Sequence, residues 1–163
     1  MKKKAVIVDV DGTLADVSDA LHHITTPGVT KDFDAFHKAA FDCPPVERTM
    51  EWCRMHYDAG LDLLVVTGRG ERYREGTEAW LKTWMDRPYI GPWMRPDNDH
   101  RPDTVVKKEI YSTLVGEYDY EIVGAIDDRP SIIRLWRSLG IETDIVYRED
   151  WVTAGESYEG LLA

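Results

Sequence analysis

The stretch AVIVDVDGT, residues 5–13, joins a run of four aliphatic residues to a polar turn. A short, continuous aliphatic run is typical of a parallel-sheet strand that is buried on both faces. Asp9 and Asp11 are separated by one residue where the run gives way to a glycine-containing turn. Both carboxylates can therefore point toward one small volume while Val10 faces the core. The stretch predicts a buried strand that presents two carboxylates at its carboxyl end.

Segments with strand and helix patterns alternate along the rest of the chain. Aliphatic runs predict further strands, and apolar residues at helical spacing predict the helices between them. Such alternation favours right-handed crossovers and a mainly parallel sheet that is covered on both faces. We therefore expect an α/β, Rossmann-like fold. The expected strands are residues 61–66, 90–94, 122–126 and 143–147, and the expected helices are residues 46–57, 71–86, 103–116 and 130–139.

A length of 163 residues is that of one domain. Hydrophobic residues make up 43% of the chain and charged residues 31%, which is ordinary for a globular protein and argues against disorder. Residues 14–45 follow no regular period. We expect residues 1–163 to form a single domain, with residues 14–45 as a small helical lid or insertion within it.

The composition excludes several classes of protein. The longest aliphatic runs, Ala5–Val8 and Leu63–Val66, are far shorter than the roughly 18 residues that a membrane span requires. Only four apolar residues follow the lysines at the N-terminus, too few for a signal peptide, so we expect a cytoplasmic protein. Cys43 and Cys53 have neither Cys-x-x-Cys nor zinc-ligand spacing, and we expect both to be packing residues.

The formal net charge is −10 at pH 7 with histidine neutral. This charge argues against broad, nonspecific wrapping of duplex nucleic acid, although a strand end could still be bound locally. About half of the charge lies in the tail from Glu142 onward. We expect that tail to be solvated surface, so the net charge says little about the face that carries the chemistry.

Polar clusters follow three of the expected strands, and in open parallel sheets ligands bind beyond the carboxyl ends of the strands. Four carboxylates gathered there repel one another unless a hard divalent cation joins them, and Mg²⁺ is the natural candidate. Mg²⁺ also binds substrate phosphate oxygens, which a lysine and a threonine hydroxyl with nearby backbone N–H groups would neutralise and orient. The pattern predicts a site for a phosphoryl group. The residues concerned are Asp9, Asp11, Thr67, Gly68, Lys107, Asp127 and Asp128.

Four motifs in a set order carry a resemblance to a known family: Asp9-Val10-Asp11-Gly12-Thr13, Thr67-Gly68-Arg69, Lys107, and Asp127-Asp128. They resemble the motifs of haloacid dehalogenase (HAD) superfamily phosphatases, over about residues 6–136. More narrowly, residues 67–69, 103–110 and 125–129 look like the 3′-phosphatase domain of bacteriophage polynucleotide kinase/phosphatase. The resemblance implies a HAD-like fold and a phosphatase that acts on nucleic-acid 3′ ends.

The resemblance also implies a role for each matching position. Asp9 would be the nucleophile that forms an aspartyl-phosphate, and Asp11 the general acid and base. Mg²⁺ would be held by Asp9, the Asp11 backbone carbonyl and Asp127, with Asp128 nearby or bound through water. The phosphate would contact Thr67, Gly68 and Lys107, Asp103 would orient Lys107, and the remaining substrate backbone would contact Arg69, Arg95 and Arg129.

Two features depart from the family pattern. The family commonly carries an arginine in the lid after the first motif, whereas the aligned position here is Ala20. This difference weakens the nucleic-acid assignment without changing the hydrolytic residues. The sequence also lacks the Gly-x-x-x-x-Gly-Lys-Ser/Thr pattern of a P-loop, so a kinase activity would come from another polypeptide. The partners that we consider are a phosphorylated substrate and a separate kinase or ligase.

Simpler interpretations compete with several of these assignments. Strand-end aspartates also occur in solvated turns and as helix caps, and neighbouring lysines, histidines or tryptophans on a helix are often surface or core residues. The residues with such an alternative are Asp9 and Asp11 (turn), Asp127 and Asp128 (cap), Lys107 (with Lys108 as its rival), His22 and His23 (surface), and Trp80 and Trp84 (core).

The function has alternatives as well. We expect a magnesium-dependent phosphomonoesterase that removes 3′-phosphates from DNA or RNA ends. A nucleotidase or another small-metabolite phosphatase is the alternative among enzymes, because a short lid could serve it equally. A noncatalytic binding module that kept the fold is the alternative outside enzymes.

Overall fold

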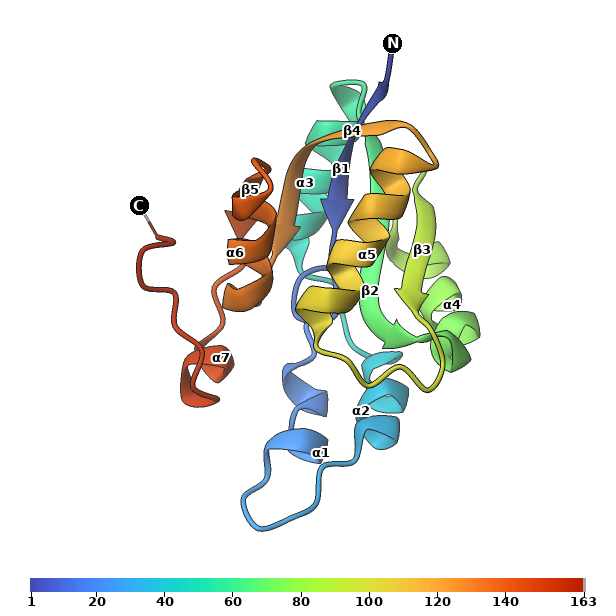
Figure 1. Cartoon of the computed structure of the whole chain (residues 1–163). Helices are drawn as coiled ribbons and strands as arrows, with labels where there is room; N and C mark the ends of the chain where they lie inside the picture. The colour runs from blue at the N-terminus through green and yellow to red at the C-terminus, as the bar shows by residue number, and fades with distance from the viewer. Residues whose placement is uncertain (163) are drawn as a thin grey trace.

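The computed structural model describes residues 1–162 and contains a five-stranded sheet with the strand order β3-β2-β1-β4-β5 (Figure 1). Every pair of neighbouring strands is parallel. The expected α/β, Rossmann-like class is confirmed, and so is the strand expected over residues 90–94, whose pattern Gly91 and Pro92 interrupt. The strands are β1 (Lys3–Val8), β2 (Asp62–Gly70), β3 (Ile90–Arg95), β4 (Tyr120–Asp127) and β5 (Glu142–Ile145).

Strand β2 is longer than its aliphatic run. The sequence predicts a loop from Thr67 onward, but Thr67, Gly68 and Arg69 lie within β2. Hydrogen bonding to the edge strand extends β2, because Gly70 pairs with Arg95 of β3. The polar composition of residues 67–69 therefore predicts too early an end for this strand.

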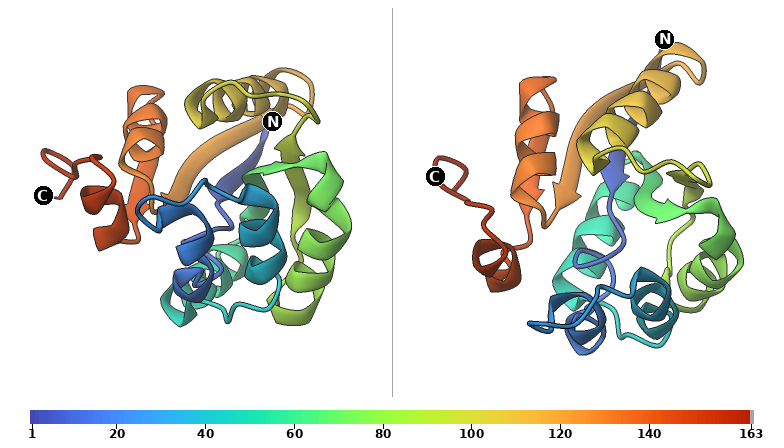
Figure 2. Two further views of the ribbon diagram at one scale, coloured as in Figure 1. Left: turned by 90° about the horizontal axis from the view of Figure 1, so that it is seen from below. Right: turned by 60° about the horizontal axis from the view of Figure 1, so that its bottom comes forward.

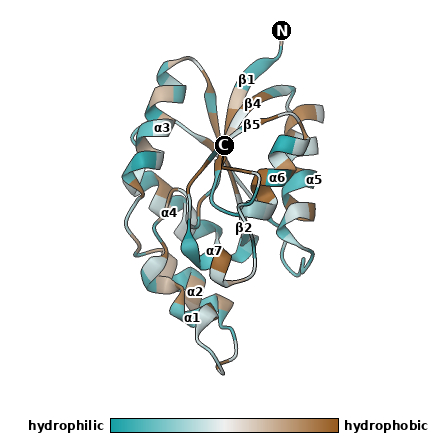
Figure 3. Cartoon of the chain, turned by 90° about the vertical axis from the view of Figure 1, so that its left-hand side faces the viewer, coloured by the Kyte–Doolittle hydropathy of each residue, from teal (hydrophilic) through white to brown (hydrophobic). Residues whose placement is uncertain are grey.

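Helices cover both faces of the sheet (Figure 3). Alternate residues of a strand face opposite sides: Val6 and Val8 pack in one core cluster, and Ala5 and Ile7 in another. The first cluster includes residues of α3 and α4, and the second includes residues of α5 and α6. These helices are α3 (Glu47–Asp58), α4 (Arg74–Trp84), α5 (Asp103–Gly116) and α6 (Pro130–Ser138), with a 3-10 helix, η2 (Glu71–Tyr73), before α4.

The segment expected to be a lid contains three short helices, η1 (Ser18–Ala20), α1 (His22–Thr25) and α2 (Phe33–Ala40). Figure 2 shows this segment in front of the carboxyl ends of the strands. Ala20 is fully buried in η1. The position where the family commonly has arginine is therefore a packing position in this chain.

The acidic tail is not the solvated surface that the sequence predicts. After β5 the chain forms α7 (Glu149–Thr153) and then returns along α6. Tyr158 and Leu161 are buried against Ile133, and two α6 arginines donate to tail carbonyls. The tail's apolar side chains pack on α6 while acidic residues such as Glu149 and Glu159 stay exposed, so net charge alone is misleading here.

Other expectations concern single residues. Cys43 and Cys53 are free and buried, as expected for packing residues. Trp80 is buried in the core, whereas Trp84 is 43% exposed. Within residues 1–162, none of the helices has the length and apolar character needed to cross a membrane.

Leu64→Ala should lower the free energy of unfolding by about 2–5 kcal/mol, because Leu64 is fully buried in β2 and its truncation leaves a cavity. Urea denaturation measures the change. Leu162, which is 58% exposed, is the matched control, and Leu162→Ala should have little effect. Equal losses of unfolding free energy in the two variants would contradict the placement of Leu64 in the core.

Candidate active site

The candidate catalytic residues lie together at the carboxyl edge of the sheet. Asp9 directly follows β1, Asp127 ends β4, and Asp128 is the next residue. Strands β1 and β4 are neighbours in register, with Val8 opposite Ile126, which brings these acids side by side. One carboxylate oxygen from each of the three buried aspartates lies within 4.8 Å of the others. This group is the acidic cluster of the site.

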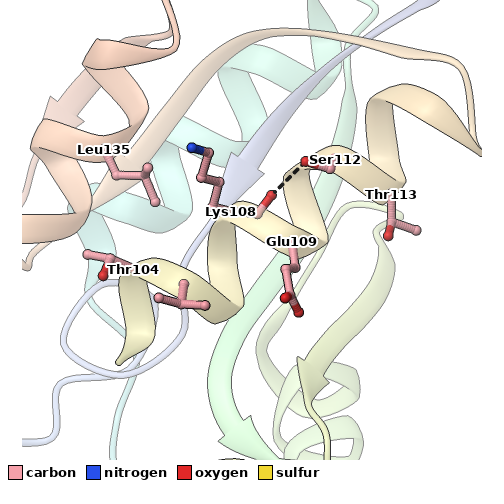
Figure 4. Close-up of a pocket in the computed structure, with 7 residues that line it drawn as sticks. Thr104, Lys108, Glu109, Ser112, Thr113 and Leu135 are labelled. Carbon is pink, nitrogen blue, oxygen red and sulfur yellow. Dashed lines mark hydrogen bonds between the residues drawn. The ribbon is translucent and has the colours of Figure 1, made fainter. Parts of the chain in front are cut away.

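Lys107 of α5 joins two members of the acidic cluster. Its Nζ lies 2.8 Å from Asp9 Oδ1 and 3.0 Å from Asp127 Oδ2. Burial alone would lower the pKa of Lys107, but the charges of Asp127 and Asp9 outweigh burial and raise it, so the ammonium stays protonated. Lys108 is exposed and lines an open groove on the outer side of α5 (Figure 4). The geometry therefore favours Lys107 over Lys108 as the site lysine.

Asp127 and Asp128 are difficult to ionise in the absence of a metal ion. Burial, followed by repulsion from Asp9, raises the pKa of Asp127 to about 6. Burial and the charges of Asp9 and Asp127 raise the pKa of Asp128 well above its usual value. A divalent cation would relieve this repulsion, and carboxylate oxygens are the ligands that Mg²⁺ prefers. The donor set therefore fits a hard metal ion.

Asp11 points to Arg69 and not into the acidic cluster. The Arg69 guanidinium donates from Nη2 and Nε to the two Asp11 oxygens, at 2.5 and 2.9 Å, and from Nη1 to Thr77 Oγ1 at 3.0 Å. Burial would raise the pKa of Asp11, but the charge and hydrogen bonds of Arg69 outweigh it and hold that pKa below its usual value. A metal contact through the Asp11 backbone carbonyl stays a prediction.

Thr13 and Gly12 shape the turn between β1 and the lid. Thr13 Oγ1 lies 2.9 Å from Asp9 Oδ2 and 3.0 Å from Asp128 Oδ1, so one hydroxyl joins the two acids. Gly12 has a φ of +79°, and a Cβ atom there would lie 2.2 Å from Asp128 Oδ2. Both the backbone conformation and the space therefore require glycine at this position.

The arginines expected at the substrate backbone all hydrogen-bond to protein groups, and their contact with a substrate stays a prediction. Arg69 is only 1% exposed. Arg95 donates to the Asp103 carboxylate and to the Gly68 carbonyl, the latter at 3.0 Å, while Arg129 donates to Asp103 at 2.8 Å. Asp103 pairs with Arg95 and Arg129, and Lys107 with Asp9 and Asp127, so orientation of Lys107 by Asp103 stays a prediction.

Sequence reasoning assigned no role to several residues that support the site. Thr13 lies within the quoted motif, so its place beside Asp9 could have been suspected. Trp151 and Tyr158 contact Asp128 from 23 and 30 residues away in sequence, and Thr77 contacts Arg69 from the following helix; no local pattern marks these residues.

A family model for the phosphatase domain of polynucleotide kinase PNKP matches residues 3–151. The chain belongs to this HAD phosphatase family. The match includes β1, the lid, α5 and β4, and hence every residue of the acidic cluster. The chain is accordingly a phosphatase of the PNKP type, and the buried acidic cluster is compatible with a divalent metal.

Two relatives that carry names are consistent with this family assignment. The chain is 27% identical over 143 residues to a putative bifunctional polynucleotide kinase/RNA ligase of Autographa californica nuclear polyhedrosis virus, covering 86% of this chain and 19% of that protein. It matches a chain of the Pnkp1/Rnl/Hen1 complex with 28% identity and a TM-score of 0.70, covering 90% of this chain and 46% of that one. This chain therefore spans less than half the length of both relatives.

A class C acid phosphatase from Bacillus anthracis shares the fold. It matches with 15% identity and a TM-score of 0.64, over 94% of this chain and 71% of that one. At that identity the match supports the HAD-like fold alone.

Arg69→Met should destabilise the PNKP-type phosphatase by roughly 3–5 kcal/mol at neutral pH, because Asp11 would be left charged and unpaired. In the wild type, Arg69 depresses the folded-state pKa of Asp11, so the pair stabilises above the unfolded value of 3.8 and loses this effect as the pH falls through the folded value. In Arg69→Met, burial without a cation raises the pKa of Asp11, so its protonation relieves the loss as the pH falls toward 3.8, and the wild type loses its own advantage below 3.8. Urea denaturation at each pH should therefore show the difference between the two proteins shrinking as the pH falls to about 4 and further below it.

The double variant Asp11→Asn/Arg69→Met is the control, because it removes both charges. It should be more stable than Arg69→Met at neutral pH. If Arg69→Met were as stable as the wild type, the ion pair between Arg69 and Asp11 would not contribute to stability.

Proposed function

We propose that this PNKP-type phosphatase removes 3′-phosphates from DNA or RNA ends, with Mg²⁺ as cofactor and Asp9 as nucleophile. The observation that carries the proposal is the buried Asp9 carboxylate, held by Lys107 and Thr13 within the acidic cluster. Lys107 Nζ lies 2.8 Å from Asp9 Oδ1, and the Thr13 hydroxyl lies 2.9 Å from Asp9 Oδ2. These two contacts orient the Asp9 carboxylate.

The proposed reaction has two displacements. An Asp9 carboxylate oxygen attacks the phosphorus atom, the bond from phosphorus to the substrate 3′ oxygen breaks, and Asp11 gives a proton to that oxygen. A water molecule then attacks the phosphorus of the aspartyl-phosphate, Asp11 takes the water proton, and Asp9 leaves as a carboxylate. Two easier steps replace one difficult step.

Arg69 makes Asp11 better suited to the second displacement than to the first. Because Arg69 lowers the Asp11 pKa, the resting carboxylate is deprotonated and ready to accept a proton. We propose that the negative charge of the bound phosphate raises this pKa, so that Asp11 can carry the proton for the leaving oxygen. Arg69 thus positions the general acid and base.

Asp9 and Asp127, with Asp128 nearby, would hold Mg²⁺, and the Asp11 backbone carbonyl would complete the protein ligands. When bound, the ion supplies positive charge for the phosphoryl oxygens. Lys107 and the Thr67–Gly68 segment would neutralise and orient the same group. Lys107 stays charged in this role because it faces two buried carboxylates.

The nucleic-acid substrate is supported by the family, by the kinase/RNA ligase and by the complex that contains Pnkp1. The internal hydrogen bonds of Arg69, Arg95 and Arg129 favour a second candidate, a small-metabolite phosphatase, because they leave fewer cations for a strand. Residues 14–45 would act as the lid in either case. We propose that a kinase or ligase step, where one accompanies this reaction, belongs to another domain or partner chain.

Phosphate release from matched oligonucleotides that carry a 3′- or a 5′-phosphate tests the proposal. We expect selective 3′ release that needs Mg²⁺, stops with EDTA, and falls to background in Asp9→Asn. The reason is that this variant keeps the shape of Asp9 but lacks a carboxylate nucleophile.

Hydrolysis of a small aryl phosphate is the parallel measurement. Activity on the aryl phosphate without activity on either oligonucleotide would reject the 3′-end substrate and favour small metabolites. Full activity in Asp9→Asn would reject Asp9 as the nucleophile.

A further inference from the structure

Trp151 of α7 makes a direct contact with the acidic cluster. Its indole Nε1 donates a hydrogen bond to Asp128 Oδ2 at 2.7 Å. The other carboxylate oxygen, Asp128 Oδ1, lies 3.0 Å from Thr13 Oγ1. The Asp128 backbone carbonyl accepts a hydrogen bond from the Tyr158 hydroxyl. Donors that precede and follow β4 in the sequence thus hold Asp128 from two sides.

The indole ring is itself held in place. The Arg129 guanidinium lies over the Trp151 ring, 4.6 Å from its centroid. Arg129 Nε donates to Glu156 Oε2 at 2.9 Å, and the Glu156 backbone N–H donates to the Trp151 carbonyl, also at 2.9 Å. These contacts restrict the orientation of the ring and therefore the direction of its N–H group.

The donor to Asp128 differs in kind from the donor to the other two acids. Lys107 neutralises Asp9 and Asp127 with a positive charge. Within residues 1–162, the Asp128 carboxylate accepts from the neutral Trp151 indole N–H, and it lies beside the Thr13 hydroxyl, whose single proton can go to Asp9 or to Asp128. A neutral donor can orient a carboxylate while leaving its charge for a cation. Groups that orient metal ligands in this way commonly change metal affinity by about 10–100-fold.

We infer that Trp151 is a positioning residue for the metal site: its indole N–H orients the Asp128 carboxylate so that Asp9, Asp127 and Asp128 can share one divalent cation. The inference rests on the proposed function, since it concerns the same site. It also assigns a structural role to the C-terminal tail. Glu156 and Tyr158 of this tail lie beyond the residues that the family model matches. Trp151 touches neither substrate nor reacting atoms in this role.

Metal affinity without substrate is the direct test. Mn²⁺, which prefers the same oxygen ligands as Mg²⁺, is titrated into the full chain, and the free ion is measured by electron paramagnetic resonance. Trp151→Phe keeps an aromatic ring but removes the N–H donor, and we expect its Mn²⁺ dissociation constant to rise about tenfold. Trp84→Phe, at a half-exposed position on α4, is the matched control and should bind Mn²⁺ like the wild type.

A second variant separates the indole donor from general loosening of the tail. Arg134→Met removes a guanidinium that holds the tail through the Glu159 carbonyl, at 2.9 Å, but keeps every contact of Asp128 and the Trp151 N–H group. Its Mn²⁺ affinity should stay close to that of the wild type. Equal weakening in Arg134→Met and Trp151→Phe would overturn the inference, as would unchanged affinity in Trp151→Phe.

A measurement on the wild type covers the case in which Trp151→Phe fails to fold. In a ¹⁵N-labelled chain, the Trp151 indole N–H resonance should shift as Mg²⁺ is added, while that of Trp84 stays in place. A Trp151 resonance that does not move at saturating Mg²⁺ would overturn this inference but not the proposed metal site. A wild-type chain that binds neither ion would overturn both the inference and the proposed metal site.

Discussion

The ammonium group of Lys107, placed between Asp9 and Asp127, is the contact on which the rest of the site depends. Carboxylates from neighbouring strands cannot be buried at one edge of a sheet without a counter-charge. Lys107 supplies it from α5, on one face of the sheet, and Arg69 supplies a second cation to Asp11 from β2. If all are ionised, the four aspartates exceed these two cations by two negative charges. A divalent cation matches this excess.

Asp9, Asp11 and Asp128 have three different kinds of hydrogen-bond partner, and each kind suits a different role. A lysine holds and orients Asp9, which the proposal makes the nucleophile. An arginine holds Asp11, the proposed acid and base, and sets its pKa. Neutral donors hold Asp128, the acid whose charge is left for a metal. One fold edge can therefore give chemically similar side chains different protonation behaviour.

The sequence predicted the parts of this site that depend on local pattern. Buried aliphatic strands followed by aspartates located Asp9 and Asp127, because parallel strands bring their carboxyl ends together. The extent of β2 was wrong, since Thr67-Gly68-Arg69 has the composition of a loop while hydrogen bonds to β3 keep it in the sheet. Arg69 was expected at the substrate backbone, and only the structure shows that it is buried and pairs with Asp11, 58 residues away in sequence.

The tail shows a different limit of sequence reasoning. Its charge pattern indicates solvated surface, but Tyr158 and Leu161 pack on α6 between exposed acids. A few apolar residues among many charges decide where such a segment lies, and their partners cannot be read from net charge. The link from Trp151 to Asp128 depends on this packing.

In the proposed mechanism Asp9 carries the phosphoryl group during turnover. The decisive experiment is acid quenching of the reaction with a ³²P-labelled phosphate monoester, followed by mass spectrometry of the labelled peptide. We expect a transient acyl-phosphate on Asp9 in the wild type and none in Asp9→Asn. Turnover with the label on another residue would rule out Asp9 as the nucleophile.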